Sequence, residues 1–279
     1  MSIYTFDSAI IDPGKWPWGF RRLLWTPAEI TTALWLDAAD SDTITEVSGA
    51  VIQWDDKSGN GYHVSQSTPD KRPVVLSAEQ NGKDVVYFDG SDDFLALSDT
   101  GLNIARNVNG LSIFVVCTNE GGDTAYRILF YSNTNSSSAG RAVLYQKSNI
   151  LGAGGRRLDA SNWQNKEIAR SGTGYALIGS IFDYGNAELY VNVNGSSLEA
   201  RGGFQTAGNT SDTRANQGGV GNVSANNQRL QGSISEIIVM QSAVGTDDRQ
   251  KLEGYLAHKW GLTANLPSVH PYKTYAPRA

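Results

Sequence analysis

Short runs of β-forming residues, separated by Gly and Asn, recur along almost the whole chain of 279 residues. In the clearest run, "NAELYVNVNGSSLEA", apolar residues alternate with other residues and then meet Asn194-Gly195, a pair typical of a type I′ hairpin turn. Many short strands with almost no helix between them predict an all-β fold, an antiparallel two-sheet jelly-roll sandwich. The runs cover residues 34–36, 51–54, 74–76, 85–88, 94–97, 111–117, 127–131, 142–146, 175–182, 187–193 and 232–240.

One helix is predicted near the C-terminus, in "VGTDDRQKLEGYLAHKWGL". Thr246 is the expected N-cap, because its side chain can accept a backbone hydrogen bond. Leu252, Leu256 and Trp260 recur at spacings of four and form one apolar face, and Gly261 can adopt the left-handed conformation that ends a helix. Burial of each large side chain contributes about 1.5–3 kcal/mol, so we expect this helix to pack on the sandwich.

The composition excludes several classes of function. A net charge of −5 argues against a nucleic-acid-binding protein, which needs clustered Lys and Arg. No apolar stretch is long enough to predict membrane insertion, and the N-terminus lacks the pattern of a signal peptide. The sole cysteine, Cys117, lies in an apolar run and is expected to be a buried, unreactive thiol. Together these features predict synthesis in a reducing cytoplasm.

The order of several segments resembles that of LamG-like jelly-roll domains, which belong to the concanavalin A-like lectin/glucanase superfamily. The variant with a C-terminal helix looks like those of tailed-bacteriophage and related virion proteins. The resemblance implies two stacked antiparallel sheets over residues 26–279, with sugar or protein ligands at the rim or concave face, and leaves residues 1–25 as an N-terminal arm. The segments are "WTPAEITTALWLDAADSDTI", "VIQWDDKSGNGYHV", "VVYFDGSDDFLAL", "LSIFVVC", "GSISEIIVMQSAVGTDDRQKLEGYLAHKWGL" and "LPSVHPYKTYAP".

The acidic stretch "FDGSDDF" has two interpretations. As a turn, Asp89-Gly90 supplies a local hydrogen bond and a positive φ, and the family resemblance places Phe88 and Phe94 in the core. As a metal site, Asp89, Asp92 and Asp93 with neighbouring carbonyl oxygens would bind Ca²⁺, although their spacing differs from that of an EF-hand.

A catalytic role is not predicted. The resemblance to glucanases would require several carboxylates at alternating positions on one strand, but "SISEIIVMQ" carries Glu236 alone. The sequence also lacks a G-x-S-x-G nucleophile motif and paired zinc-ligand histidines.

Candidate glycan-binding residues centre on Trp163 in the polar stretch "DASNWQNK". Sugar sites combine an exposed aromatic face with amide and carboxylate groups, and the long polar stretch 201–228 can add further contacts. Trp163 can equally be a loop anchor packed on the sheet, and the stretch can be an insertion without a ligand. The predicted set is Trp163, Asn162, Gln164, Asp159, Asn209, Arg214 and Asn216.

The N-terminal stretch "KWPWGFRRLLW" is rich in aromatic and Arg residues, which dominate interface hot spots. It is predicted either to dock on a partner or to cover an edge of its own sandwich. The predicted docking residues are Trp16, Trp18, Phe20, Arg21, Arg22 and Trp25.

These observations and the resemblance lead to one functional hypothesis and two alternatives. The hypothesis is a virion surface protein (a head fibre or spike, a decoration protein or a tail appendage) made in the bacterial host cytoplasm. It would bind host-surface polysaccharide through its loops, attach to other virion subunits through the arm, and form a homo-oligomer. The alternatives are a purely structural decoration or assembly protein and a glycan-degrading enzyme.

Overall fold

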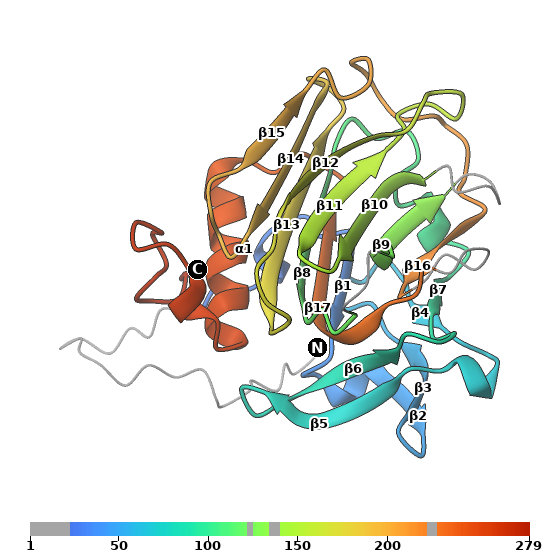
Figure 1. The fold of residues 1–279 in the computed structure, drawn as a ribbon, viewed down its shortest axis with the longest axis vertical. Coiled ribbons are helices and arrows are strands. Elements are labelled where there is room, and N and C mark those ends of the chain that lie inside the picture. The colour runs from blue at the N-terminus through green and yellow to red at the C-terminus, as the bar shows by residue number, and fades with distance from the viewer. Residues whose placement is uncertain (1–22, 122–124, 134–139, 222–227) are drawn as a thin grey trace, which may run out of the picture.

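The computed structural model describes residues 23–121, 125–133, 140–221 and 228–279. Its strands form two stacked antiparallel sheets, and helix α1 (Thr246–Lys259) packs beside them (Figure 1). This arrangement confirms the predicted all-β sandwich with one C-terminal helix. Short 3₁₀ turns lie at Pro27–Glu29 (η1), Ser41–Thr43 (η2), Pro69–Lys71 (η3), Gly101–Asn103 (η4) and Thr263–Asn265 (η5).

The sheet that contacts α1 is called the inner sheet here. It consists of β1 (Leu34–Asp37), β5 (Val74–Gln80), β6 (Lys83–Asp89), β8 (Leu111–Cys117), β13 (Ala176–Asp183), β14 (Glu188–Val193), β15 (Glu199–Gly202) and β17 (Gln231–Met240). The strand order is β15-β14-β13-β8-β17, and the free edge of β17 pairs with β6 at one end and with β1 at the other. β5 then pairs with β6.

The second sheet, called the outer sheet here, lies across the inner one. It consists of β2 (Ile44–Val47), β3 (Ala50–Trp54), β4 (Val64–Ser65), β7 (Leu95–Leu97), β9 (Arg127–Asn133), β10 (Gly140–Lys147), β11 (Ile150–Gly155), β12 (Gln164–Ala169) and β16 (Gln217–Val220). Its order is β12-β11-β10-β9-β16-β7-β4-β3-β2. One pairing, Ala50 with Val74, connects β3 to β5 and so joins the two sheets.

Both faces of β8 and β17, in the centre of the inner sheet, are buried, because the outer sheet covers one face and α1 covers the other. In β8, Ile113 and Val115 pack between the sheets, whereas Phe114 and Val116 belong to the cluster under α1. This explains why "LSIFVVC" is apolar throughout rather than alternating. Cys117 is fully buried as predicted, and burial raises its pKa to about 11.

The helix uses the predicted apolar face. Leu252, Leu256 and Trp260 all lie in the cluster between α1 and the inner sheet. Gly261 has a φ of +69°, and the Leu262 N–H donates to the Ala257 carbonyl at 2.7 Å, which closes the helix in a Schellman motif. The predicted N-cap was wrong by one residue: Gly245 occupies that position, so Thr246 begins the helix.

Several strands were not predicted from the sequence. β11 and β12 were missed because "ILGAGG" is rich in glycine and "QNKEIA" is mostly polar, so neither has the composition of a buried strand. The stretch 201–228 was predicted as one loop, but its residues Gln217–Val220 form β16 between β7 and β9. Phe94 was also placed wrongly, since it is half-buried while Leu95 and Leu97 enter the core.

Candidate functional site

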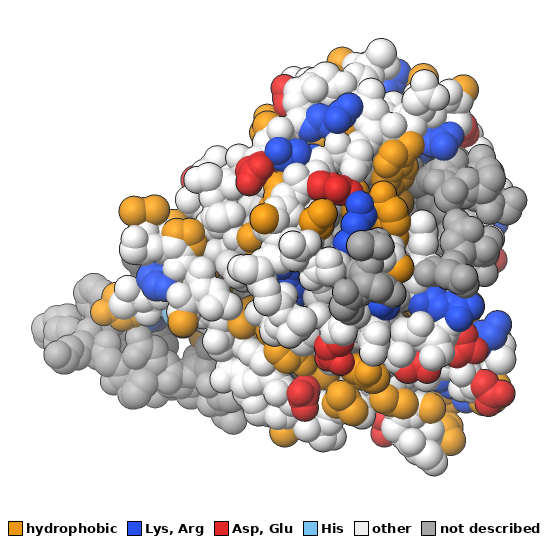
Figure 2. Space-filling model, viewed as in Figure 1, with side chains coloured by type: hydrophobic (Ala, Val, Ile, Leu, Met, Phe, Trp, Pro, Cys, Tyr) orange, Lys and Arg blue, Asp and Glu red, His pale blue; other side chains and the backbone are white. Residues whose placement is uncertain are grey.

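The side of the outer sheet that faces away from the core carries an apolar cluster of its own. The cluster consists of Ile128, Tyr131, Val143 and Tyr145, with Trp163 packed against it. Figure 2 shows this side of the molecule, where hydrophobic side chains lie beside charged ones. The β10–β11–β12 register places Tyr145, Gly152 and Glu167 in one row across the sheet.

Two glycines of β11 allow aromatic rings to lie on the sheet. A Cβ added at Gly152 would lie 2.3 Å from Cζ of Tyr145, and a Cβ added at Gly154 would lie 2.6 Å from Cζ2 of Trp163. Any other residue at these positions would displace the rings. Glycine in a strand interior costs stability and marks a close approach, here by the rings of Tyr145 and Trp163.

Polar groups surround these rings. The Tyr145 hydroxyl donates to Oε1 of Glu167 at 2.7 Å, and the Lys147 Nζ donates to the same oxygen at 2.7 Å. The Asn165 amide donates to the Tyr145 hydroxyl at 2.9 Å. Burial alone would raise the pKa of Glu167, but the hydrogen bonds from Lys147 and Tyr145 outweigh it and lower that pKa. Glu167 is therefore ionised at neutral pH.

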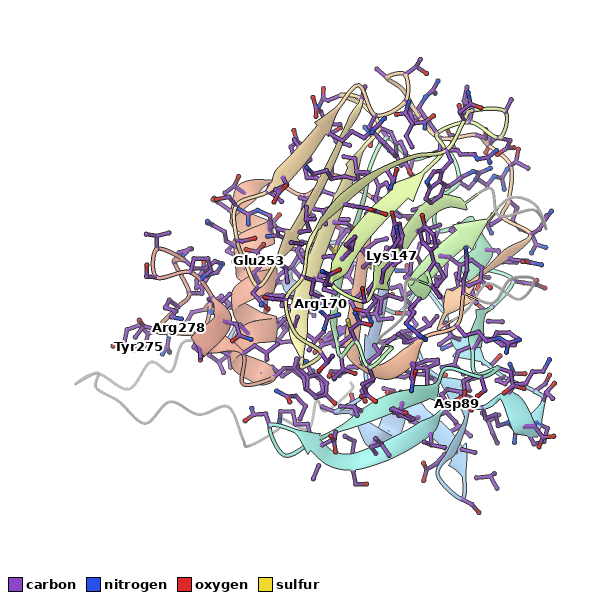
Figure 3. The ribbon with its side chains drawn as sticks, viewed as in Figure 1. Asp89, Lys147, Arg170, Glu253, Tyr275 and Arg278 are labelled. Carbon is purple, nitrogen blue, oxygen red and sulfur yellow. The ribbon has the colours of Figure 1, made fainter. Side chains whose placement is uncertain are left out.

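Tyr126 completes the group and is partly open to solvent, with 37% of its surface exposed. Its ring centroid lies 4.9 Å from that of Tyr145, and the Lys147 Nζ lies 4.3 Å from the Tyr126 centroid. Figure 3 shows Lys147 in the middle of this side of the outer sheet. The group is called the aromatic face below and consists of Tyr126, Tyr145, Lys147, Trp163, Asn165 and Glu167.

The aromatic face offers groups for noncovalent contact with a ligand. It offers the partly exposed rings of Tyr126 and Trp163, an ammonium group, a carboxylate and a carboxamide on a pleated surface with adjacent strands about 4.8 Å apart, whereas Tyr145 is buried beneath them. Its one carboxylate is engaged by Lys147 and Tyr145 rather than facing a second carboxylate. A ring face beside hydrogen-bonding groups fits the alternating apolar and hydroxyl surfaces of a sugar.

Some of the predicted ligand residues adjoin the aromatic face. Trp163 is half-buried, so it is both anchored to the sheet and partly open to solvent. Asn162 and Gln164, which flank Trp163 in the chain, both bind Gln205. Nε2 of Gln205 donates to the Asn162 carbonyl at 2.9 Å, and the backbone N–H of Gln205 donates to Oε1 of Gln164 at 2.8 Å.

The remaining predicted ligand residues lie in surrounding loops. Asp159 pairs with the buried Arg141 at 3.0 Å. The carbonyl of Asn209 accepts from Arg157 at 2.7 Å, and Arg214 pairs with Asp99 at 3.1 Å. Asn216 is exposed. The aromatic face does not include these residues, and their ligand roles remain predictions.

The acidic stretch forms the predicted turn. Gly90 has a φ of +79°, and Oδ1 of Asp89 accepts the Ser91 N–H at 2.7 Å. Oδ2 of Asp93 accepts the Asp89 N–H at 2.9 Å. The carboxylates of Asp89, Asp92 and Asp93 offer oxygens within 4.8 Å of one another, a donor set suited to Ca²⁺. Calcium binding remains a prediction.

The residues predicted to dock on a partner fall into two groups. Trp16, Trp18, Phe20, Arg21 and Arg22 lie outside the described residues. Trp25 was predicted either to dock on a partner or to help cover its own sandwich, and only 3% of its surface is exposed. Its ring centroid lies 6.2 Å from that of Tyr255, and its N–H donates to the Pro277 carbonyl at 3.0 Å. Trp25 is therefore part of the core under α1, because the C-terminal segment covers it.

Glu236 is fully buried under α1 and is not available to a substrate. It accepts hydrogen bonds from the indole nitrogens of Trp35, at 2.7 Å, and Trp260, at 2.6 Å. Lys259 bridges Glu236, at 2.9 Å, and Asp37, at 2.5 Å. Burial raises the pKa of Glu236. Burial would also raise the pKa of Asp37, but the charges of Lys259 and Lys57 outweigh it, so the pKa of Asp37 is lowered.

Sequence reasoning missed Tyr126, Tyr145, Lys147, Asn165 and Glu167. A signal was present, because Val143, Tyr145 and Lys147 alternate along "RAVLYQK" as the outward residues of a strand should. The pairing of this strand with glycine-rich β11, and of β11 with polar β12, is a tertiary feature that the pattern of one strand cannot give.

Three solved structures are similar to this chain, and the first of those named here supports the overall fold. The binding domain of botulinum neurotoxin serotype D matches with a TM-score of 0.55 and 9% identity, over 80% of this chain and 50% of that chain. The binding domain of serotype D/C matches with a TM-score of 0.49 and 13% identity, over 81% and 52%. A CBM40 of the Ruminococcus gnavus IT-sialidase, bound to α2,3-sialyllactose, matches with a TM-score of 0.46 and 16% identity, over 63% and 92%.

The chain thus spans about half the length of the neurotoxin binding domains. No protein-family model matches it, and no curated protein matches it significantly. At such identities the similarity shows the fold alone. Across the described residues, no helix has the length and apolar character needed to cross a bilayer.

Proposed function

We propose that this chain is a carbohydrate-binding protein and that its aromatic face is the ligand site. The observation that carries the proposal is the pair of partly exposed rings, Tyr126 and Trp163, which pack against the cluster of the buried Tyr145, with Lys147 and Glu167 beside it. A structural role alone does not call for a charged pair beside two partly exposed aromatic rings. The solved neurotoxin domain that shares the fold is itself named a binding domain, in line with this proposal.

The biological setting is proposed from the family resemblance. The chain would stand on the surface of a phage-like particle and bind host-surface polysaccharide, with residues before Leu23 attaching it to other virion subunits. Self-association into a homo-oligomer would place several aromatic faces side by side, so that weak sites act together. Binding rather than hydrolysis is proposed, because Glu236 lies in the core and Glu167 is held by Lys147.

A glycan-array screen followed by calorimetry tests the proposal. Trp163→Ala should weaken binding of any glycan found by about tenfold or more, because stacking on one ring is worth on the order of 1 kcal/mol and the substitution also frees Tyr145 to move. Tyr275→Ala is the matched control, since Tyr275 is 66% exposed but lies in the C-terminal segment away from the outer sheet (Figure 3). Its affinity should equal that of the unchanged protein.

Two results would contradict the proposal. Equal affinity of the Trp163→Ala variant and the unchanged protein would place the ligand elsewhere. Absence of binding to every host polysaccharide would favour the purely structural alternative, and released oligosaccharide would favour an enzyme.

A further inference from the structure

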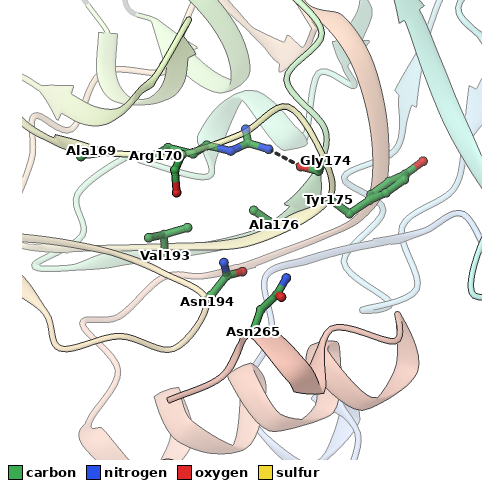
Figure 4. Close-up of a pocket in the computed structure, with 9 residues that line it drawn as sticks. Ala169, Arg170, Gly174, Tyr175, Ala176, Val193, Asn194 and Asn265 are labelled. Carbon is green, nitrogen blue, oxygen red and sulfur yellow. Dashed lines mark hydrogen bonds between the residues drawn. The ribbon is translucent and has the colours of Figure 1, made fainter. Parts of the chain in front are cut away.

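A second candidate site lies away from the aromatic face, where the turn between β12 and β13 approaches the end of β14 and η5. It is a cavity of about 320 Å³, called the Arg170 cavity here, and Figure 4 shows Arg170 on one side of it with Asn194 and Asn265 on the other. Its volume is at the lower end of the roughly 300–1,000 Å³ typical of small-molecule sites, which suits one sugar ring rather than a chain.

Arg170 is the only charged residue among those that line the cavity. Its side chain is 1% exposed and donates to the carbonyls of Cys117, at 3.1 Å, and Gly174, at 2.9 Å, and to the Gln146 side chain. In the described ranges, no Asp or Glu forms an ion pair with it. Arg141, which is just as buried, instead pairs with Asp159 at 3.0 Å.

A buried guanidinium held only by neutral acceptors leaves a positive potential beside the cavity. Burial of a charge without an opposite charge is costly, and the interaction with an incoming anion is strengthened by the low local dielectric. Neutral acceptors hold the two terminal nitrogens of Arg170 but leave its buried Nε without a hydrogen-bond partner, and they do not remove its charge. The field therefore favours a ligand that carries a negative charge.

The other lining residues favour a ligand with hydroxyl groups. Oδ1 of Asn194 accepts the Leu177 N–H at 3.0 Å, so the side-chain NH₂ group of Asn194 is left to donate to a ligand. The side chains of Ser171 and Asn265 make no hydrogen bond with the part of the chain that the structure describes, and both residues are exposed at the cavity mouth. Val193 and Ala176 supply apolar contact.

We propose that the Arg170 cavity binds a single acidic sugar residue, with the carboxylate on the Arg170 side and the hydroxyl groups on Asn194 and Asn265. This site goes beyond the proposed function, since it lies elsewhere on the molecule and needs no ligand on the aromatic face.

The test uses the full chain labelled with ¹⁵N and titrated at constant ionic strength with D-glucuronate, D-glucose or acetate. Glucuronate should shift the amide resonances of residues 170–176 and 193–195, and glucose should bind there at least about tenfold more weakly, the equivalent of about 1.4 kcal/mol. Acetate should also bind more weakly than glucuronate, because it lacks the ring. Asn265→Asp should reduce glucuronate affinity by about tenfold through charge repulsion.

The control variants separate charge from shape. Asn265→Ala removes the same amide without adding charge and should weaken binding only about twofold to threefold. Arg170 is not replaced, because its loss would leave the Cys117 and Gly174 carbonyls without their donor.

Three outcomes would overturn the proposal. The first is the absence of shifts at residues 170–176 and 193–195 with glucuronate. The second is equal binding of glucuronate with glucose or with acetate. The third is an Asn265→Asp variant that binds glucuronate as tightly as Asn265→Ala does.

Discussion

Asp93 shows how burial tunes one side chain of the acidic turn. Only 5% of its surface is exposed, and burial raises the pKa of Asp93 from 3.8 to about 6 although the Asp89 N–H bond opposes the change. Below about pH 4 the carboxyl is protonated in both the folded and the unfolded chain. Between about pH 4 and 6 only the folded chain keeps the proton, so stability falls as the pH rises through this window.

Asp93→Asn should therefore flatten the pH dependence of stability. Asparagine keeps an oxygen that can accept the Asp89 N–H, but it does not ionise. At pH 7 the variant should be more stable by on the order of 1–2 kcal/mol, and at pH 4 it should be close to the unchanged protein. Melting temperatures measured from pH 4 to 7, with Asp92→Asn as the control, test this. The same change of melting temperature with pH in Asp93→Asn and in the unchanged protein would contradict it.

At the scale of elements, the docking of α1 depends on a buried ionic group as well as on apolar contacts. Lys259 of α1 bridges Glu236 of β17 and Asp37 of β1, at distances of 2.9 and 2.5 Å. Two carboxylates and one ammonium group therefore meet where the helix lies on the inner sheet. Lys57 reaches Asp37 from a loop at 2.8 Å and supplies the second cation.

Lys259→Met should destabilise the fold by about 3–5 kcal/mol, because it leaves Glu236 buried without its cation. Lys251→Met makes the same chemical change at a half-buried position on the same helix and should change the free energy of unfolding by less than about 1 kcal/mol. Denaturant unfolding of both variants measures the difference. Equal free energies of unfolding would mean that Lys259 contributes little.

The strands that could be predicted are those whose burial is visible in composition. β8 and β17 are apolar because both of their faces are covered. The Asn194-Gly195 turn was predicted from its residue types, and both residues do adopt a positive φ. β11 and β12 could not be predicted in the same way. Gly152 and Gly154 leave room for the rings of Tyr145 and Trp163, and this steric role can be recognised only once the pairing of the strands is known.

At the scale of the whole molecule, the N- and C-terminal segments close the fold together. Leu24 forms a bridge with Arg278, and Trp25 packs into the core under α1. The sequence placed the boundary of the arm after Trp25, but the contacts of Trp25 belong to the sandwich. The chain pattern could not reveal this, because the partners of Trp25 lie more than 200 residues away.

Two truncations test that arrangement. Removal of residues 1–22 should leave the melting temperature close to that of the full chain, since Leu24 and Trp25 remain. Removal of residues 1–25 should lower stability by about 3–5 kcal/mol, the usual cost of deleting a buried Trp. Equal melting temperatures of the two truncated chains would show that Trp25 adds little to the core.

Mapping by amide chemical shifts, with a glycan found in the array screen, is the sharpest test of whether carbohydrate binds to the aromatic face. The largest shifts are expected along β10, β11 and β12, at residues 143–147, 152–154 and 163–167, and they should be lost in Trp163→Ala but not in Tyr275→Ala. Shifts confined to the loops at residues 203–216, to the C-terminal segment or to the Arg170 cavity would contradict it.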